Sequence, residues 1–280
     1  MKTRIIFFFV LAAVFIPVVW FCETPVMPVF MSLMAAIGAF EAARCVGIHR
    51  QIHITAVSAA YAAAFPVIIR FAGAECFLSV APASAGLLLL FFMASSMFSK
   101  GRVRLADALE LAAAVIYIAF GFSSAVLVCD SGETGRWIFY SVFITAWVTD
   151  TAAFICGKLF GRHKLIPDVS PKKTVEGAVG GVVFNVAVFA LYGFILSRFG
   201  VAEFKPAVIL PVAAVASVFS QIGDLVMSHL KREHGIKDFG RIFPGHGGVL
   251  DRFDSVLAVA TVIAAAECFV SLFPSIENAI

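Results

Sequence analysis

Charged residues are scarce in this chain of 280 residues. Asp, Glu, Lys and Arg make up 14% of the sequence, whereas hydrophobic residues make up 61%. A soluble domain would carry nearer a quarter charged residues. Several stretches of more than about eighteen residues hold few or no charges, which is typical of membrane-spanning helices. The composition argues against an ordinary soluble domain and predicts an all-α, polytopic integral membrane protein.

Two familiar kinds of site are also missing from the sequence. The six cysteines are scattered, and no CxxC pair or Cys/His pair has the spacing of a zinc site. No GxxxxGK[ST] or GxGxxG motif occurs, which weighs against nucleotide recognition by the common soluble folds. The net charge of +3 says little by itself, and we expect no nucleic-acid partner.

About nine apolar segments are predicted to cross the membrane, at approximately 5–22, 25–43, 54–72, 76–98, 106–128, 137–156, 176–197, 206–227 and 253–273. With this count, the amino end and alternate connections on one side hold 17 of the 21 Lys and Arg residues. The positive-inside rule therefore places the amino end in the cytoplasm. We expect the first segment to be retained, since no small-x-small cleavage site follows it.

The predicted spans divide the chain into two regions. Residues 1–130 hold about five spans, and residues 131–280 form a catalytic region with two long cytoplasmic loops, 157–176 and 228–252. Glu41 and Arg44 are one helical turn apart and are interpreted as a local ion pair. Basic residues of the first region are interpreted as determinants of topology alone: Arg44, Arg50, Lys100, Arg102 and Arg104.

Aspartates from separate helices are predicted to meet the two basic loops at the cytoplasmic face. Ionisable groups at membrane depth are costly and are candidates for function. Carboxylates bind magnesium, which bridges phosphate oxygens, and Lys and Arg neutralise phosphate charge. The glycines of the Pro-Gly-His-Gly-Gly turn allow backbone N–H groups to approach a phosphate. The catalytic candidates are Asp150, Asp224, Lys231, Arg232, Asp251 and Asp254. The substrate-binding candidates are Ser170, Lys172, Lys173, Lys237, His246, Gly247, Gly248 and Arg252.

Two sequence blocks carry a resemblance to a known family. The run from Ser228 to Asp254, SHLKREHGIKDFGRIFPGHGGVLDRFD, resembles the signature of the phosphatidate cytidylyltransferases. The blocks WVTD, ending at Asp150, GKLFGR, starting at Gly157, and SPKKTVEG, starting at Ser170, resemble the second motif of that family. Phe154 stands where many members have Tyr, and this departure removes no charge. The likeness covers roughly residues 147–260. Separately, Gly177, Gly180 and Gly181 are interpreted as residues that allow helices to pack closely.

The resemblance implies an enzyme of phospholipid biosynthesis. Its reaction is the transfer of the cytidylyl group of CTP to phosphatidic acid, which gives CDP-diacylglycerol and pyrophosphate and requires Mg²⁺. The family pattern assigns Asp224 and Asp251 as metal ligands and suggests a second, monovalent cation such as K⁺. Family likeness also suggests a homodimer. From the predicted topology we expect an active site at the cytoplasmic ends of the sixth, eighth and ninth spans that opens sideways to membrane lipids, and the compact chain favours a bacterial inner-membrane enzyme.

Two alternatives stay open. A cytidylyltransferase or CTP-dependent kinase acting on another lipid phosphate or on a polyprenol would need similar anionic machinery, which sequence separates poorly. A cation- or proton-coupled transporter belongs to a different class. It is disfavoured because the candidate carboxylates gather at one membrane face, whereas transporter sites lie near the midplane.

Overall fold

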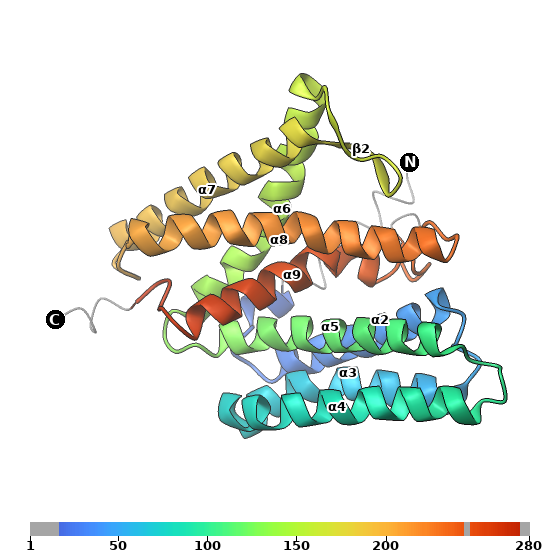
Figure 1. Cartoon of the computed structure of the whole chain (residues 1–280). Helices are drawn as coiled ribbons and strands as arrows, with labels where there is room; N and C mark the ends of the chain where they lie inside the picture. Colours follow the sequence, from blue (N-terminus) through green and yellow to red (C-terminus); the bar gives the residue numbers. More distant parts are fainter. Residues whose placement is uncertain (1–16, 244–246, 275–280) are drawn as a thin grey trace. The chain divides into compact units, whose positions relative to one another are not determined.

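The computed structural model describes residues 17–243 and 247–274, which are almost entirely helical (Figure 1). Eight long helices and one small sheet occur within these residues. The helices are α2 (Val26–Cys45), α3 (Ile52–Ala72), α4 (Ala74–Phe98), α5 (Leu105–Cys129), α6 (Gly135–Phe160), α7 (Val175–Arg198), α8 (Pro206–Glu233) and α9 (Leu250–Glu267). The strands are β1 (Lys164–Ile166) and β2 (Ser170–Thr174). The predicted all-α class is confirmed.

Six segments of the described chain are long and apolar enough to cross a membrane, so the protein is an integral membrane protein. One of them, Ile52–Phe98, comprises both α3 and α4, which are separated by Gly73 at a φ of +87°. Helix α9 is not among the six, because its 18 residues include four charged ones. Most of the first predicted span, 5–22, lies outside the described residues. The count of nine spans and the cytoplasmic amino end stay predictions.

The described chain forms two compact units. Unit 1 comprises the described residues up to Leu127 together with Leu230–Phe253, and unit 2 comprises Val128–His229 together with the described residues from Asp254 onward. The chain passes from unit 2 to unit 1 within α8 and returns within α9. The predicted division between residues 130 and 131 concerned spans and loops, and it stays a prediction.

Unit 1 contains helices α2 to α5, and α3 and α4 form a hairpin within it. The hydroxyl groups of Tyr61 in α3 and Ser84 in α4 are hydrogen-bonded at 3.3 Å. The Phe65 ring contacts Phe77 of α4 and Phe120 of α5 in edge-to-face geometry, at 5.6 Å and 5.9 Å between centroids. Figure 1 shows α3 and α4 side by side. Aromatic contacts therefore join three helices of unit 1 in its core.

Helices α6 and α7 of unit 2 approach each other closely because small residues lie where they cross. A Cβ atom on Gly177 would lie 2.6 Å from the carbonyl oxygen of Ala153, and one on Gly180 would lie 2.5 Å from the Cys156 side chain. The predicted packing role of these glycines is confirmed. One pair of buried polar side chains joins α6 to α8, since the Thr149 and Ser217 hydroxyls are hydrogen-bonded at 2.8 Å. Such pairing avoids unsatisfied polar groups at membrane depth.

The predicted loop 157–176 contains regular structure. Helix α6 extends to Phe160, and β1 and β2 then form an antiparallel hairpin that pairs Lys164 with Thr174. Thr174 also begins the next helix, since its hydroxyl accepts a 3.1 Å hydrogen bond from the backbone N–H of Gly177. The hairpin therefore holds the Ser-Pro-Lys-Lys segment as a strand that runs directly into α7.

Candidate active site

A cavity of about 540 Å³ lies in unit 2, bounded by residues of α6, the β-hairpin, α7 and α8. Its wall holds two carboxylates and four ammonium groups. These charged residues are Asp150, Asp224, Lys158, Lys164, Lys172 and Lys173. The volume is within the range of roughly 300–1,000 Å³ typical of small-molecule sites. The excess of cations over carboxylates suits an anionic ligand.

Asp224, in the cavity wall, makes both an ion pair and a hydrogen bond. Its Oδ2 atom lies 2.6 Å from the ammonium nitrogen of Lys173, and its Oδ1 atom accepts a 3.2 Å hydrogen bond from Ser228. The Lys173 nitrogen makes no well-aligned hydrogen bond, so its contact with Asp224 is an ion pair without directional bonding. Both side chains are 27% exposed. An ion pair of this kind is open to rearrangement when an anion or a cation enters.

Asp150 lines the same cavity from α6. Its Oδ2 atom accepts a 3.3 Å hydrogen bond from the hydroxyl of Ser255 in α9. Gln221, another residue of the cavity wall, donates to the carbonyl oxygen of Ala178 at 3.2 Å and so joins α8 to α7. These contacts fix the two helices that present Asp150 and Asp224.

The carboxylates of the cavity fit a magnesium ion better than a metal held entirely by protein. Within residues 17–243 and 247–274, no group of three or more His, Cys, Asp or Glu side chains could hold a metal ion. Magnesium usually takes one or two carboxylates and completes its shell with substrate oxygens and waters. Asp224 and Asp150 supply that donor set, and Lys173 is the counter-ion that a metal would replace.

A second cluster, the Asp251 network, lies in unit 1. Asp251 Oδ1 is 2.7 Å from the ammonium nitrogen of Lys231, and Oδ2 accepts hydrogen bonds of 2.8 Å from the backbone N–H groups of Phe239 and Gly248. The Lys231 and Asp251 side chains are 9% and 4% exposed. The Lys231 ammonium also lies 5.2 Å from the centre of the Phe239 ring, in cation–π range. Both carboxylate oxygens of Asp251 therefore have partners within unit 1.

Glu41, which the sequence analysis did not connect to the signature, belongs to the same network. Glu41 is 2% exposed, and its carboxylate accepts hydrogen bonds from the N–H groups of Val249 and Leu250, at 3.1 Å and 2.9 Å. It thus satisfies donors at the start of α9, where helices favour an acid. A Cβ atom on Gly248 would collide with this carboxylate, which explains the glycine at that position.

The predicted ion pair between Glu41 and Arg44 is wrong. Glu41 points to the start of α9, and the Arg44 guanidinium donates to the carbonyl oxygen of Phe239 at 2.7 Å. Two residues of α2 therefore hold the loop before α9 through its backbone. Glu41 is the sole acidic residue in a helix of 20 residues, and this could have marked it as a candidate from the sequence.

The remaining candidates of the signature have varied surroundings. Arg232 is exposed and donates to the carbonyl oxygen of Ile236 at 2.9 Å, and Lys237 and Arg252 are also exposed. Asp254, half-buried in α9, accepts a 2.8 Å hydrogen bond from the N–H of Ser255. Gly247 has a φ of +88°, a conformation that favours glycine.

Two further candidates, Ser170 and His246, belong to neither the cavity wall nor the Asp251 network as described. Ser170 is half-buried at the start of β2, opposite Ile166. His246 lies outside the described residues.

The structure thus gathers the candidates into two groups. Asp150, Lys172, Lys173 and Asp224 line the cavity of unit 2, and Lys231, Gly247, Gly248 and Asp251 meet in unit 1. Asp224 belongs to unit 2 and Asp251 to unit 1, and the prediction that they share a metal stays a prediction.

Comparisons with known proteins agree with the chemistry of these residues. A phosphatidate cytidylyltransferase of Staphylococcus saprophyticus is 40% identical over 168 residues, which cover 60% of this chain and 62% of the relative. That of Staphylococcus epidermidis is 39% identical over 180 residues, which cover 64% and 66%. The chain therefore spans a little under two thirds of these relatives. The profile of the Cytidylyltransferase family matches residues 2–269, and the chain belongs to that family.

Proposed function

We propose that this protein transfers the cytidylyl group of CTP to phosphatidic acid, and that it releases CDP-diacylglycerol and pyrophosphate. The observation that carries the proposal is the cavity of unit 2, in which two carboxylates and four lysines line one space. Family membership and the phosphatidate cytidylyltransferase relatives support the choice of substrates.

The chemistry needs positioning and charge neutralisation more than proton transfer. A phosphate oxygen of phosphatidic acid attacks the α-phosphorus of CTP, the bond from that phosphorus to the bridging oxygen breaks, and pyrophosphate leaves with the electron pair. The nucleophile is already an anion, so no strong general base is required. The difficulty is the repulsion between two phosphate groups, which fixed cations reduce.

The lysines of the cavity have the reach and the charge for this role. Lys172 and Lys173 are held on β2, and Lys158 lies in the last turn of α6. Their ammonium groups would bind the triphosphate and the lipid phosphate, since Lys binds phosphate as a point charge. Lys173 would leave its ion pair with Asp224 and bind a phosphate oxygen of the substrate instead.

Magnesium is the metal that this donor set supports. Asp224, with Asp150, would hold the ion, and when bound it would offset negative charge on the phosphate oxygens. The assignment of Asp251 as a further ligand, and of a monovalent cation such as K⁺, rests on the resemblance alone. The contacts of Asp251 with Lys231 and two backbone N–H groups give it a structural role as well.

We further propose that the reaction takes place at the inner face of the bacterial cytoplasmic membrane. CTP is a soluble cytoplasmic substrate, whereas phosphatidic acid stays in the bilayer. A cavity reached from the cytoplasm and from the lipid would meet both substrates. A homodimer is proposed from the resemblance.

The direct test is pyrophosphate release by the purified protein in detergent. We expect release to require CTP, phosphatidic acid and Mg²⁺ together, and to stop when EDTA removes the metal. A panel of four nucleoside triphosphates against phosphatidic acid, a polyprenyl phosphate and diacylglycerol separates the related reactions. A preference for a polyprenyl phosphate, or phosphorylation of diacylglycerol, would reassign the substrate, and no release from any pair would refute the proposal.

A further inference from the structure

A second cavity, of about 550 Å³, lies in unit 1 at the end of the α3–α4 hairpin. It is lined by the start of α3, the end of α4 and the loop that follows α4. None of the residues that carry the proposed cytidylyl transfer belongs to it. Its volume is again within the range of roughly 300–1,000 Å³ that is typical of sites for small molecules.

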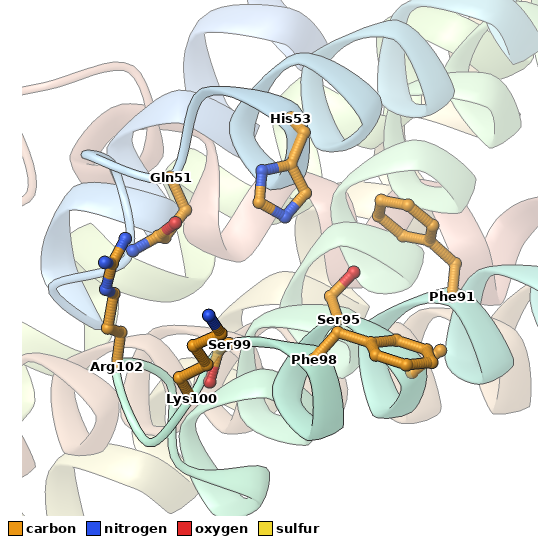
Figure 2. A pocket seen from close by; sticks show the side chains of 9 residues that line it. Gln51, His53, Phe91, Ser95, Phe98, Ser99, Lys100 and Arg102 are labelled. Carbon is orange, nitrogen blue, oxygen red and sulfur yellow. The ribbon is translucent and has the colours of Figure 1, made fainter.

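The cavity is polarised along its length. Figure 2 shows the guanidinium of Arg102 beside Gln51, with the Lys100 ammonium on the same side. The rings of Phe91 and Phe98 lie on the opposite side. One end therefore offers cations and hydrogen-bond donors, and the other offers an aromatic, apolar surface.

No described carboxylate balances the positive charge of this cavity. No Asp or Glu lines it, and no described carboxylate forms an ion pair with Lys100 or Arg102. The neighbouring Arg104 differs, since it lies 4.0 Å from Asp107 and is not part of the wall. A site with two unpaired cations and no carboxylate suits a ligand that carries negative charge.

The loop that carries both cations is fixed in shape. Ser99 accepts a 3.1 Å hydrogen bond from the N–H of Val103 and donates to the carbonyl oxygen of Ser96 at 2.7 Å, and Ser96 donates to the carbonyl oxygen of Val103 at 3.0 Å. Lys100 is the one non-glycine residue of the described chain with a positive φ, at +55°. Strained backbone of this kind is concentrated at ligand sites and persists where the surroundings enforce it. A role in membrane topology would need the charges but not this geometry.

We propose that this cavity binds the phosphate of an anionic glycerophospholipid. Lys100 and Arg102 would contact the phosphate, and Phe91 and Phe98 would contact the hydrocarbon near the glycerol. The position suits such a ligand, because α3 begins and α4 ends at the two ends of Ile52–Phe98, a segment long and apolar enough to cross a membrane, and lipid headgroups lie at the ends of such segments. The inference is independent of the proposed cytidylyl transfer.

The test is binding of phosphatidylglycerol, which is not a proposed substrate, to the full-length protein in detergent, followed by native mass spectrometry. We expect the wild type to retain phosphatidylglycerol in preference to phosphatidylcholine. The Lys100→Gln/Arg102→Gln variant should bind it about thirtyfold more weakly, from the usual contribution of two basic residues near anionic lipid. Its thermal stability in detergent should match that of the wild type, which shows that the variant is folded.

The matched control is Arg50→Gln/Arg104→Gln, which removes two cations outside the cavity wall. It should bind phosphatidylglycerol as the wild type does. Equal weakening in both double variants, or none in the first, would overturn the proposal. Displacement of the lipid by millimolar sn-glycerol 3-phosphate or inorganic phosphate would also overturn it, because the site would then select a soluble phosphate.

Discussion

The two aspartate clusters use the same residue types in opposite ways. In unit 1, Asp251 is 4% exposed and is bound by Lys231 and two backbone N–H groups. In unit 2, Asp224 is 27% exposed, borders a cavity and is paired with a lysine that makes no aligned hydrogen bond. The first is a satisfied network, and the second is a pair with room for a ligand.

This difference indicates that the charged residues singled out from the sequence have two different roles. Buried, fully paired charges such as Lys231 and Asp251 fix the conformation of the loop before α9. Partly exposed charges around a cavity, such as Lys173 and Asp224, are available to bind substrate. Substitutions in the first cluster should therefore lower stability, and those in the second should lower activity.

The largest expected effect is the loss of Lys231. Lys231→Met would leave the Asp251 carboxylate buried without its counter-ion, which costs about 3–5 kcal/mol of unfolding free energy. The measurement is thermal stability of the purified protein in detergent, without substrates. Lys237→Met, which removes an exposed cation from the same loop, is the control and should change stability little. A stable Lys231→Met protein would show that the network is not structural.

The next effect is on turnover. Asp224→Asn keeps the shape of the side chain but removes the charge that the cavity offers to a cation, and we expect a loss of about 10²–10³-fold in pyrophosphate release. Thermal stability should stay near that of the wild type, because Asp224 is partly exposed. Asp168→Asn removes an exposed carboxylate that does not border the cavity, and it should keep full activity. Near-normal turnover of Asp224→Asn would remove the cavity from the mechanism.

A smaller effect is expected at Glu41. Glu41→Ala would leave the N–H groups of Val249 and Leu250 without their acceptor in a buried position, at a cost of about 2–3 kcal/mol. Glu41→Gln keeps one carbonyl acceptor and should recover part of the loss. Amide hydrogen exchange at the start of α9 is the sharper measurement. Unchanged exchange there in Glu41→Ala would contradict the role assigned to this residue.

The smallest expected effect is the difference in stability between Gly→Ala substitutions at two positions. Gly248→Ala would force the new Cβ against the Glu41 carboxylate and should destabilise the protein by about 1–3 kcal/mol. Gly86→Ala in α4 meets open space and should be neutral or stabilising by up to about 1 kcal/mol, since Ala favours helix. Thermal midpoints of the two variants in detergent measure the difference. Equal midpoints would mean that the Glu41 carboxylate moves away at little cost.

Part of the site follows from the sequence. Asp150 and Asp224 were predicted at the same end of their helices, and both line one cavity with Lys172 and Lys173. Hydropathy and charge alternation predict helix ends at a common depth, and that depth stays a prediction. In a membrane protein the sequence therefore predicts the depth of each helix end, which the sequence of a soluble protein does not.

Other features could not be predicted, for physical reasons. Strands of three and five residues, such as β1 and β2, carry too little alternation to separate them from a polar loop. Helix α8 continues to Glu233, six residues beyond the predicted span at 227, since hydropathy reports membrane thickness and not where helical hydrogen bonding ends. The contact of Glu41 with residues 249 and 250 is separated by more than 200 positions, so local spacing favoured the wrong partner.

The contrast between the satisfied Asp251 network and the open carboxylates of the unit 2 cavity is tested most directly by equilibrium binding of CTP. The purified protein is measured without any lipid, with and without Mg²⁺. We predict that the wild type binds CTP in a Mg²⁺-dependent manner, and that Asp224→Asn loses this dependence while it remains folded. Mg²⁺-dependent binding of equal affinity in Asp224→Asn would contradict it, because the open carboxylates of unit 2 would then have no part in holding the metal and the nucleotide.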